Sequence, residues 1–445
     1  MANNEKLRRW GLDKAAFFGL LLLGLLLAKL LISSRTDFKL SEPVGVKGTG
    51  LTVSVPADGG WKSLSDSFKY EDNEFRLASL MQINSNSAIS LRWRYLLQPS
   101  QEGASQQFEA MAASVQGKIE SVKSEKFGDF TFDYAQISSE KAVVLCGTTV
   151  LPDGKVITLE VAHKGLGGDL AEKIFKALLA SVKYLPDNPL TKGVEFLKNF
   201  KASYSEILPR QGHRDYYHIK DTRGNTIGFS TDSISYSADS NDDSAVTFAG
   251  ISFISSSYNT YTEQTVFHSD ISLRRFDWTI KQGSLLTNRQ QPTHIQLDDE
   301  NVLTVQKNDV INKFYFTDSM VPDVIFDRVV AEFLKSKFDT VMLEIILSDG
   351  KIAPVILSRI KTSETSVLPA QSAAQVEFFG AYTVHQKMYF DGQKGLLSAE
   401  IQGSFSYRLE RTTRADILAD FPQWLDKIQM MEQYQMKKGS KDIKK

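Results

Sequence analysis

The stretch AVVLCGTTVLPDGKVITLEVAH, residues 142–163, predicts two antiparallel strands joined by a tight turn. Apolar and β-branched residues dominate 142–151 and 155–163, and residues of these types favour strands. Pro152-Asp153-Gly154 separates the two runs and is typical of a hairpin turn, since Pro fixes φ and Gly tolerates a positive φ. We therefore expect this part of the chain to contain a β-hairpin.

Two predicted helices lie on either side of that hairpin in the sequence. Apolar residues at helical spacing predict helices over 102–117 and 168–182. The segment 185–189, LPDNP, follows as a linker. Residues 50–187 are thus expected to form an α+β domain with an α/β sandwich-like arrangement. The other strands predicted in it are 51–56, 88–97 and 130–137.

The beginning and the end of this segment resemble a known family. LTVSVPADGGWKSL (51–64) places Pro56 and Trp61 after an apolar strand, and FKALLASVKYLP (175–186) supplies a closing helix and strand. These features resemble PsbP-like domains over residues 51–186. The resemblance implies an α/β/α sandwich that serves as an adaptor or docking fold, without shared catalytic residues.

Residues 188–412 are dominated by predicted strands. Helices are predicted only over 191–208 and 324–334, and the segments 221–225 and 348–350 have the composition of hairpin turns. Long antiparallel strands with so few helices predict a larger, strand-rich antiparallel curved-sheet domain that is half-barrel-like. The expected strands are 215–220, 226–237, 245–256, 261–273, 276–281, 294–297, 302–306, 341–347, 351–360, 376–384, 388–390 and 396–409.

Two hairpin sequences carry a second resemblance. YYHIKDTRGNTIGFSTDSISYS (216–237) and VMLEIILSDGKIAPVILSRI (341–360) are similar to the repeating hairpins of LolA/LolB-like periplasmic carriers. The similarity is one of pattern over residues 215–411. It implies a curved sheet that wraps an apolar cavity, with a helix as its plug.

The N-terminus predicts a membrane anchor. AAFFGLLLLGLLLAKLLI (15–32) follows a basic stretch, and about 18 apolar residues nearly span a hydrocarbon core of about 30 Å. A cleaved signal peptide is the alternative, although the apolar run is longer than a usual signal core. Lys29 lies close enough to the outer end for its ammonium group to reach the headgroups. We expect a cytoplasmic basic head at 1–14, a transmembrane anchor at 15–33 and a tether at 34–49.

Taken together, these patterns predict an α+β chain with an N-terminal transmembrane helix, the sandwich-like domain and the curved-sheet domain. A C-terminal helix and basic tail occupy 413–445, with the helix expected at 415–436. Because positive flanks stay in the cytoplasm, the predicted localisation is the inner membrane, single-pass, with the bulk of the chain in the periplasm.

Composition excludes some classes of function. The net charge of −1 argues against a nucleic-acid partner, which would require a basic surface. Cys146 is the single cysteine, so no internal disulfide can form. Its position inside an apolar strand predicts a core thiol rather than a nucleophile.

Candidate chemical groups are few. His213 and His218 are predicted to lie on opposite faces of a strand because their spacing is odd. Asp239-Ser240-Asn241-Asp242-Asp243 has the oxygens of a calcium loop, but Ser244 replaces the turn Gly and Gly250 replaces the closing Glu, so a polar hairpin tip is expected. Asp298-Asp299-Glu300 is likewise expected to be a turn. No catalytic residue, metal ligand or cofactor is predicted, and the ligand-binding residues are left open.

A group of aromatic residues leaves two interpretations open. They can form the core of the sheet, because aromatic residues favour strands, or some of them can line an apolar ligand cavity. The group is Phe229, Tyr236, Phe248, Phe253, Tyr258, Tyr261, Phe267, Phe276 and Trp278.

The predicted function is that of a membrane-anchored, extracytoplasmic, non-catalytic binding or docking protein of the bacterial envelope. Its expected partners are the bilayer, through the N-terminal helix, and an envelope protein or an apolar ligand. Three alternatives remain: a lipid or lipoprotein carrier that uses an apolar cavity in the second domain, a membrane-anchored hydrolase with an unrecognised site, and a structural or sensory subunit of a larger envelope complex.

Overall fold

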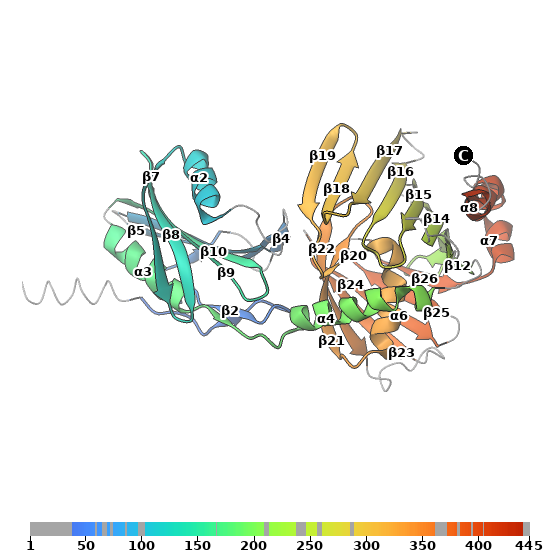
Figure 1. The fold of residues 1–445 in the computed structure, drawn as a ribbon, viewed down its shortest axis with the longest axis horizontal. Coiled ribbons are helices and arrows are strands. Elements are labelled where there is room, and N and C mark those ends of the chain that lie inside the picture. Colours follow the sequence, from blue (N-terminus) through green and yellow to red (C-terminus); the bar gives the residue numbers. More distant parts are fainter. Residues whose placement is uncertain are drawn as a thin grey trace, which may run out of the picture.

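The structure is a computed structural model of the 445-residue chain. It describes residues 38–438 except 58–59, 65–68, 72–73, 85–86, 97–102, 166, 209–212, 237–245, 256–259, 285–288, 361–371, 381–382, 393–394 and 404. Two large antiparallel sheets lie one after the other along the longest axis (Figure 1).

The first sheet has eight strands, all antiparallel, and two helices cover its opposite faces (Figure 1). The expected hairpin forms its β9–β10 pair, and Gly154 in the turn has a φ of +79°. α2 (Ala104–Ser114) packs on one face and α3 (Gly168–Ala180) on the other. The strands are β3 (Lys62–Ser63), β4 (Lys69–Glu71), β5 (Glu74–Asn84), β6 (Ser87–Leu96), β7 (Lys118–Phe127), β8 (Phe130–Ser138), β9 (Val143–Val150) and β10 (Val156–Gly165).

Alternation along β9 explains why both faces are apolar. Leu145 joins the core beneath α3, whereas Cys146 packs in the core beneath α2. β10 does the same, with Leu159 facing α3 and Ala162 facing α2. α2 contacts β7, β8 and β9, so the face of β5, β6 and β10 beside it is left without a covering helix.

A small sheet connects the two large ones. β2 (Leu51–Val53) pairs with β1 (Val44–Gly45) on one side and β11 (Lys183–Tyr184) on the other. The linker then begins α4 (Pro189–Ala202), whose N-terminus is capped by the Asn188 side chain at 3.0 Å from the amide nitrogen of Thr191. The helix expected over 191–208 is divided at Ser203 into α4 and α5 (Tyr204–Ile207).

The second sheet has fifteen strands in one continuous order from β19 to β20. Every pair is antiparallel except β20–β21, which is parallel. The strands are β12 (His213–Lys220), β13 (Thr226–Tyr236), β14 (Val246–Ser255), β15 (Thr260–Ser269), β16 (Phe276–Ser284), β17 (Arg289–Leu297), β18 (Val302–Lys307), β19 (Val310–Tyr315), β20 (Met320–Pro322), β21 (Thr340–Ile346), β22 (Ile352–Ile360), β23 (Ser372–Phe378), β24 (Val384–Asp391), β25 (Gly395–Gln402) and β26 (Tyr407–Arg411).

This sheet curls until its two ends approach each other. The β21–β22 turn reaches β18, since a Cβ on Gly350 would lie 2.3 Å from Cγ1 of Val305. Ser348 in the same turn accepts a hydrogen bond from Gln282 of β16 at 2.9 Å. The short helices η1 (Asp323–Ile325) and α6 (Phe326–Lys335) lie inside the curve (Figure 1).

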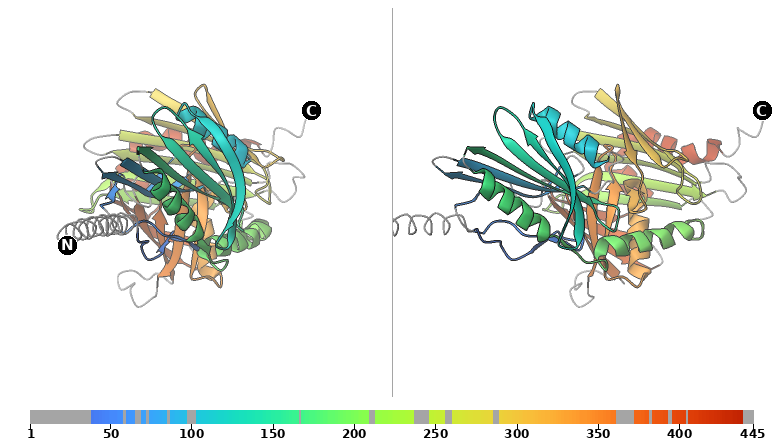
Figure 2. Two further views of the ribbon diagram at one scale, coloured as in Figure 1. Left: turned by 90° about the vertical axis from the view of Figure 1, so that its left-hand side faces the viewer. Right: turned by 60° about the vertical axis from the view of Figure 1, so that its left-hand side comes forward.

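The C-terminal helices cover the outer face of the curved sheet, at the end of the molecule remote from the first sheet (Figures 1 and 2). Trp424 and Ile428 pack there against Phe229 and Phe253. The helix expected over 415–436 is interrupted at Pro422, which starts a 3-10 turn. The elements are α7 (Arg414–Asp420), η3 (Pro422–Trp424) and α8 (Leu425–Lys438).

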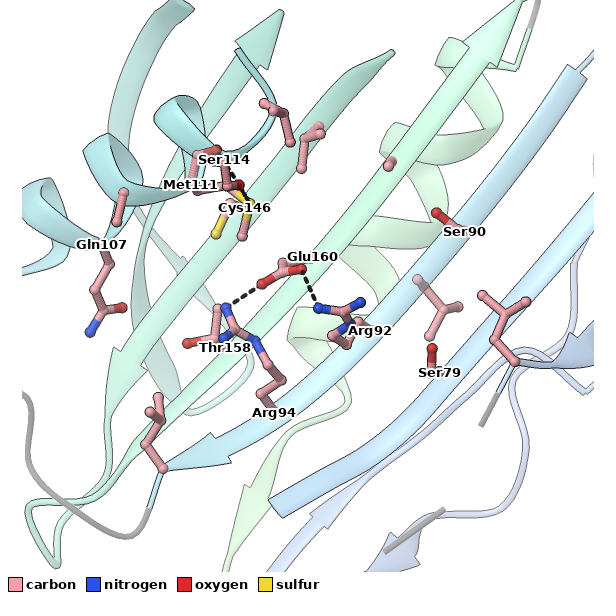
Figure 3. A pocket seen from close by; sticks show the side chains of 17 residues that line it. Ser79, Ser90, Arg92, Arg94, Gln107, Met111, Ser114, Cys146, Thr158 and Glu160 are labelled. Atoms are coloured by element: carbon pink, nitrogen blue, oxygen red, sulfur yellow. Dashed lines mark hydrogen bonds and ion pairs between the residues drawn. The ribbon is translucent and has the colours of Figure 1, made fainter. Parts of the chain in front are cut away.

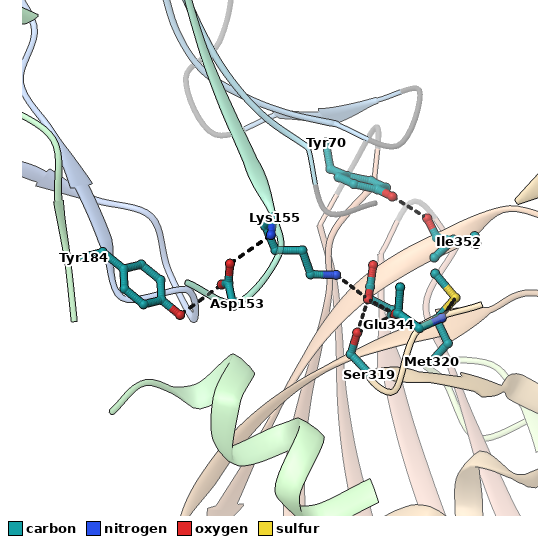
Figure 4. A network of polar contacts seen from close by, with 9 residues as sticks. Tyr70, Asp153, Lys155, Tyr184, Ser319, Met320, Glu344 and Ile352 are labelled. Carbon is teal, nitrogen blue, oxygen red and sulfur yellow. Dashed lines mark hydrogen bonds and ion pairs between the residues drawn. The ribbon is translucent and has the colours of Figure 1, made fainter. Parts of the chain in front are cut away.

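The two large sheets share part of one hydrophobic core. Met342, Ile356 and Phe379 of the second sheet belong to the core of the first, and the Phe75 and Phe379 rings lie 5.6 Å apart. Polar contacts surround this apolar patch (Figure 4). Tyr70 donates a hydrogen bond to the carbonyl oxygen of Ile352 at 2.8 Å. The junction is therefore a packed interior rather than a loose contact.

The fold class predicted from the sequence is corrected by this structure. The chain is strand-rich with large antiparallel sheets, so the expected balance of an α+β protein is wrong. The anchor predicted at 15–33, with Lys29, lies outside the described residues, as does the basic head. Within 38–438 as described, no helix is both long and apolar enough to cross a membrane; α4 and α8, the longest, have 14 residues each where about 20 are needed. The described residues therefore give no support to the predicted transmembrane helix or to the predicted single-pass inner-membrane localisation.

Candidate functional site

A groove with a volume of about 650 Å³ lies beside α2 (Figure 3). Its floor is the uncovered face of β5, β6, β9 and β10, and α2 forms one wall. We call this cavity the α2 groove. Its lining residues are Leu64, Ser79, Ser90, Leu91, Arg92, Arg94, Leu96, Gln107, Ala110, Met111, Ser114, Val115, Val144, Cys146, Thr158, Glu160 and Ala162.

The alternation of β6 puts two arginines on the floor. Trp93 and Tyr95 are fully buried on the α3 side of the sheet, so their neighbours Arg92 and Arg94 project into the groove. The register pairs Glu160 of β10 directly with Arg92. The floor therefore carries a row of charged side chains across two adjacent strands (Figure 3).

The arginine nearer the end of β6 is tightly paired. Arg94 donates from Nη2 to Glu160 and from Nη1 to Glu74 Oε2 at 3.1 Å. Burial opposes its charge, but the carboxylates of Glu160 and Glu74 outweigh burial and raise the pKa of Arg94 above its usual value. Its Nε is buried and has no hydrogen-bond partner. One donor of this guanidinium group is thus unsatisfied in the structure.

The other arginine is held loosely. Arg92 approaches Glu160 only to 3.9 Å, and its side chain is 48% exposed. At that distance the contact is an ion pair without a hydrogen bond. The lining of the groove holds two guanidinium groups and one carboxylate, and Arg94 has a second carboxylate, Glu74, from outside the lining, so Arg92 is the less compensated cation.

The side of the groove formed by α2 is apolar. Met111 of α2 and Val115, which follows the helix, lie beside Val144 and Cys146 of β9. Cys146 is buried, as the sequence predicts for a core thiol, and burial, together with the charge of Glu160, raises its pKa to about 12. The thiol is therefore protonated at neutral pH and is a poor nucleophile.

The histidines and acidic turns singled out in the sequence do not converge on this groove. His213 Nε2 lies 3.0 Å from Asp215 Oδ1 on the inner face of β12, and His218 Nε2 lies 3.3 Å from Asp420 on the outer face. Asp298 caps its own turn by accepting from the amide of Val302 at 2.8 Å. The segment 239–243 lies outside the described residues. No group of three or more His, Cys, Asp and Glu residues in the described ranges can hold a metal ion.

The aromatic residues of the second region divide between core and cavity. Phe229 and Phe253 pack beneath the C-terminal helices, whereas Phe267 and Phe276 belong to the core of the curved sheet. Only Phe248 and Trp278 of the group also line the cavity beside α6, and Tyr258 lies outside the described residues. That cavity has a volume of about 240 Å³ and contains four carboxyl groups. It therefore differs from the apolar ligand cavity that was one of the two interpretations of these aromatic residues.

Comparison with known proteins finds similarity to solved structures alone. No protein-family model and no curated protein matches the chain. A crystal structure of a beta-barrel-like protein of a domain of unknown function, DUF1849, from Brucella abortus is similar to it, with 12% sequence identity and a TM-score of 0.33. The similarity covers 46% of this chain and 98% of that chain. These findings show neither a PsbP-like nor a LolA/LolB-like relationship.

Proposed function

We propose that the protein is a non-catalytic binding protein and that its ligand is an amphiphile with an acidic group, held in the α2 groove. The observation that supports this proposal most directly is the pair Arg92 and Arg94 on the groove floor, one half-exposed and one with a buried Nε that has no partner. A carboxylate or sulfonate placed between them would accept charge-assisted hydrogen bonds, which are among the stronger ones in proteins.

The rest of the groove suits the apolar body of such a ligand. Met111, Val115 and Leu96 offer apolar surface close to the charged floor. A volume of about 650 Å³ falls within the usual range for small-molecule sites, which are mostly apolar with a few fixed polar groups. Methionine adapts its shape to different partners and so supports binding more than catalysis.

Two fluorescent probes of similar shape, one anionic and one neutral, test the proposal. 8-Anilinonaphthalene-1-sulfonate carries a sulfonate, whereas N-phenyl-1-naphthylamine has the same aromatic body without the charge. We expect the full chain to bind the sulfonate probe with a stoichiometry of one and the neutral probe more weakly. Arg92→Gln is expected to lower the affinity for the sulfonate probe about tenfold, which is the effect of losing one charged hydrogen bond. The affinity for the neutral probe should stay nearly unchanged.

Arg274→Gln is the matched control, because Arg274 is exposed and far along the chain from the groove. A sulfonate affinity that is the same in Arg92→Gln and in the unaltered protein would contradict the proposal. Competition with dodecanoate and with an acetylated peptide of alternating Leu and Glu then separates a free amphiphile from an acidic segment of a protein partner. The competitor that displaces the probe at the lower concentration shows whether the acidic group belongs to a free amphiphile or to a protein segment.

The carrier alternative has less support. A lipid tail requires a continuous apolar cavity, and the cavity beside α6 holds Asp232, Glu263, Asp323 and Asp327 in about 240 Å³. The groove on the first sheet is thus the better candidate for ligand binding.

A further inference from the structure

Carboxyl groups from two different parts of the fold face each other inside the curved sheet. The cavity of about 240 Å³ lies between the η1–α6 helices and strands β12–β16, and strands β24–β26 complete its lining. Asp323 and Asp327 come from the helices, and Asp232 of β13 and Glu263 of β15 come from the sheet. We call η1–α6 (residues 323–335) the plug and strands β12–β16 the wall.

The plug is anchored on its other side by apolar packing. Val329, Val330 and Phe333 are fully buried in the core of the curved sheet. The Phe326 ring lies 5.6 Å from Phe378 of β23, and Arg359 of β22 donates to the carbonyl oxygen of Ser336 at 2.8 Å, just after α6. The β21–β23 side of the plug is therefore held firmly, and the carboxyl groups lie on the side that faces the wall.

Few cations balance these acids. Arg328 of α6 comes within 4.0 Å of Asp215 on β12, and Arg411 of β26 also donates to Asp215. Both guanidinium groups contact this fifth carboxylate, which also contacts His213, and Arg328 in addition offsets the charge of its neighbour Asp327. The other titratable groups around the cavity are Tyr217, Tyr261, Tyr407 and Asp349.

The wall makes room for one of the acids. Asp232 is opposite Gly250 of β14 in the register, and a Cβ at Gly250 would lie 2.7 Å from Asp232 Oδ1. Glu263 is satisfied differently, because it accepts from Gln282 Nε2 at 2.8 Å and from Ser348 Oγ at 3.1 Å. Asp232 thus points into the cavity toward the plug, while Glu263 is tied to its neighbours.

Three of these carboxyl groups have raised pKa values. Burial, then the neighbouring Asp327 and Asp215, raises the pKa of Asp232 to about 8. Burial, then Glu263 and Asp327, raises the pKa of Asp323 to about 7. Burial also raises the pKa of Asp327, against the opposing charge of Arg328. Ionising all of them would place like charges close together in a poorly solvated space.

We propose that η1–α6 is a pH-sensitive plug, which sits against the wall while the facing carboxyl groups share protons and loosens from it when they ionise. Protonated carboxyls can donate hydrogen bonds across the cavity, whereas ionised ones can only accept. Because the apolar side of α6 stays packed, repulsion opens the gap toward β12–β16 rather than unfolding the sheet. The opening is a local event of the kind that amide exchange detects.

Hydrogen–deuterium exchange with mass spectrometry on the full chain tests this proposal at pH 6 and pH 9. Each rate is divided by the intrinsic exchange rate at the same pH, so that only structural protection is compared. We expect the protection of peptides covering 323–335 to fall about tenfold at pH 9, the factor that one unit of differential pKa produces. Peptides covering α3 serve as an internal reference and should keep their protection.

The same exchange experiment on variants with substituted carboxyl groups is the second part of the test. In Asp232→Asn and in Asp323→Asn, each made alone, the loss of protection at pH 9 should be reduced, and in the double variant it should be absent. Asp309→Asn, in the exposed β18–β19 turn, should behave as the unaltered protein. Equal protection at the two pH values in the unaltered chain would overturn the proposal. So would a parallel loss in α3, or a full pH response in the double variant.

Discussion

Lys155 and Glu344 form a buried ion pair across the junction of the two sheets, with Nζ 3.0 Å from Oε2 (Figure 4). Lys155 lies just before β10 and Glu344 lies within β21, so the pair joins segments almost two hundred residues apart in the chain. Ser319 and Thr317 also donate to Glu344 Oε2, whereas Oε1 has no hydrogen-bond partner. Each charge therefore depends on the other for its compensation in a dry interior.

Removing the lysine should destabilise the protein strongly. In Lys155→Met the Glu344 carboxylate stays buried without its cation, and we expect the free energy of unfolding in urea to fall by about 3–5 kcal/mol. Adding Glu344→Gln to this variant should recover part of the loss. Lys351→Met, which breaks an exposed pair with Asp349, is the control and should cost no more than about 1 kcal/mol.

A glycine in α4 is predicted to be indispensable for its contact with β21. A Cβ at Gly193 would lie 1.9 Å from the carbonyl oxygen of Met342, a distance that requires the helix or the strand to move. Gly193→Ala should therefore destabilise the protein by about 1–3 kcal/mol, although Ala favours helices by about 1 kcal/mol. Gly154→Ala is the comparison variant. Nothing lies near a Cβ at Gly154, so this substitution tests only the strain of a positive φ. A Gly193→Ala protein as stable as the unaltered one would mean that α4 does not press on β21 as described.

The cavity acid Asp232 predicts a pH dependence of stability with a definite sign. Its pKa is about 8 in the folded chain against about 3.9 when unfolded, so the native state binds more protons between these values. Stability contributed by this group is thus present below pH 4 and is lost as the pH rises to 8. Asp232→Asn should be at least about 1 kcal/mol more stable than the unaltered protein at pH 8 and nearly equal to it at pH 4. Urea unfolding at these two pH values measures the difference.

The thiol of Cys146 should be almost unreactive in the native protein. Its pKa of about 12 leaves about one thiol in 10⁴ ionised at pH 8, and only the thiolate attacks a disulfide reagent. Reaction with 5,5′-dithiobis(2-nitrobenzoate) at pH 8 should be about a thousandfold slower than in 8 M urea. A native rate close to the unfolded rate would show that the wall of the α2 groove opens readily at Cys146.

Local patterns in the sequence predict many of the elements, because those patterns depend on near neighbours. The hairpin at 152–154 and the helix expected over 168–182 appear as the β9–β10 turn and α3. The pattern does not predict β7, since KIESVKSEKF is highly charged and lacks the alternation of a half-buried strand. It is an edge strand whose side chains are mostly exposed, so tertiary pairing rather than pattern decides its structure.

The candidate site could be predicted only in part. Arg92 and Arg94 alternate with Leu91, Trp93 and Tyr95, and that alternation was a readable sign of two arginines on one face. Their meeting with Glu160 depends on the register of β6 with β10, which residue spacing does not supply. The acids around α6 are likewise brought together by long-range pairing.

The shared core at the junction limits how the chain can be divided. Met342, Ile356 and Phe379 complete the interior of the first sheet, and Leu185 and Leu190 of the connecting segment are hydrogen-bonded back to Gly50 and Gly48. Each half, if separated from the other, would expose apolar residues that are buried in the intact protein. A protease cut between Tyr184 and Pro189 should therefore leave two fragments that remain associated and refold by complementation, as a split protein does.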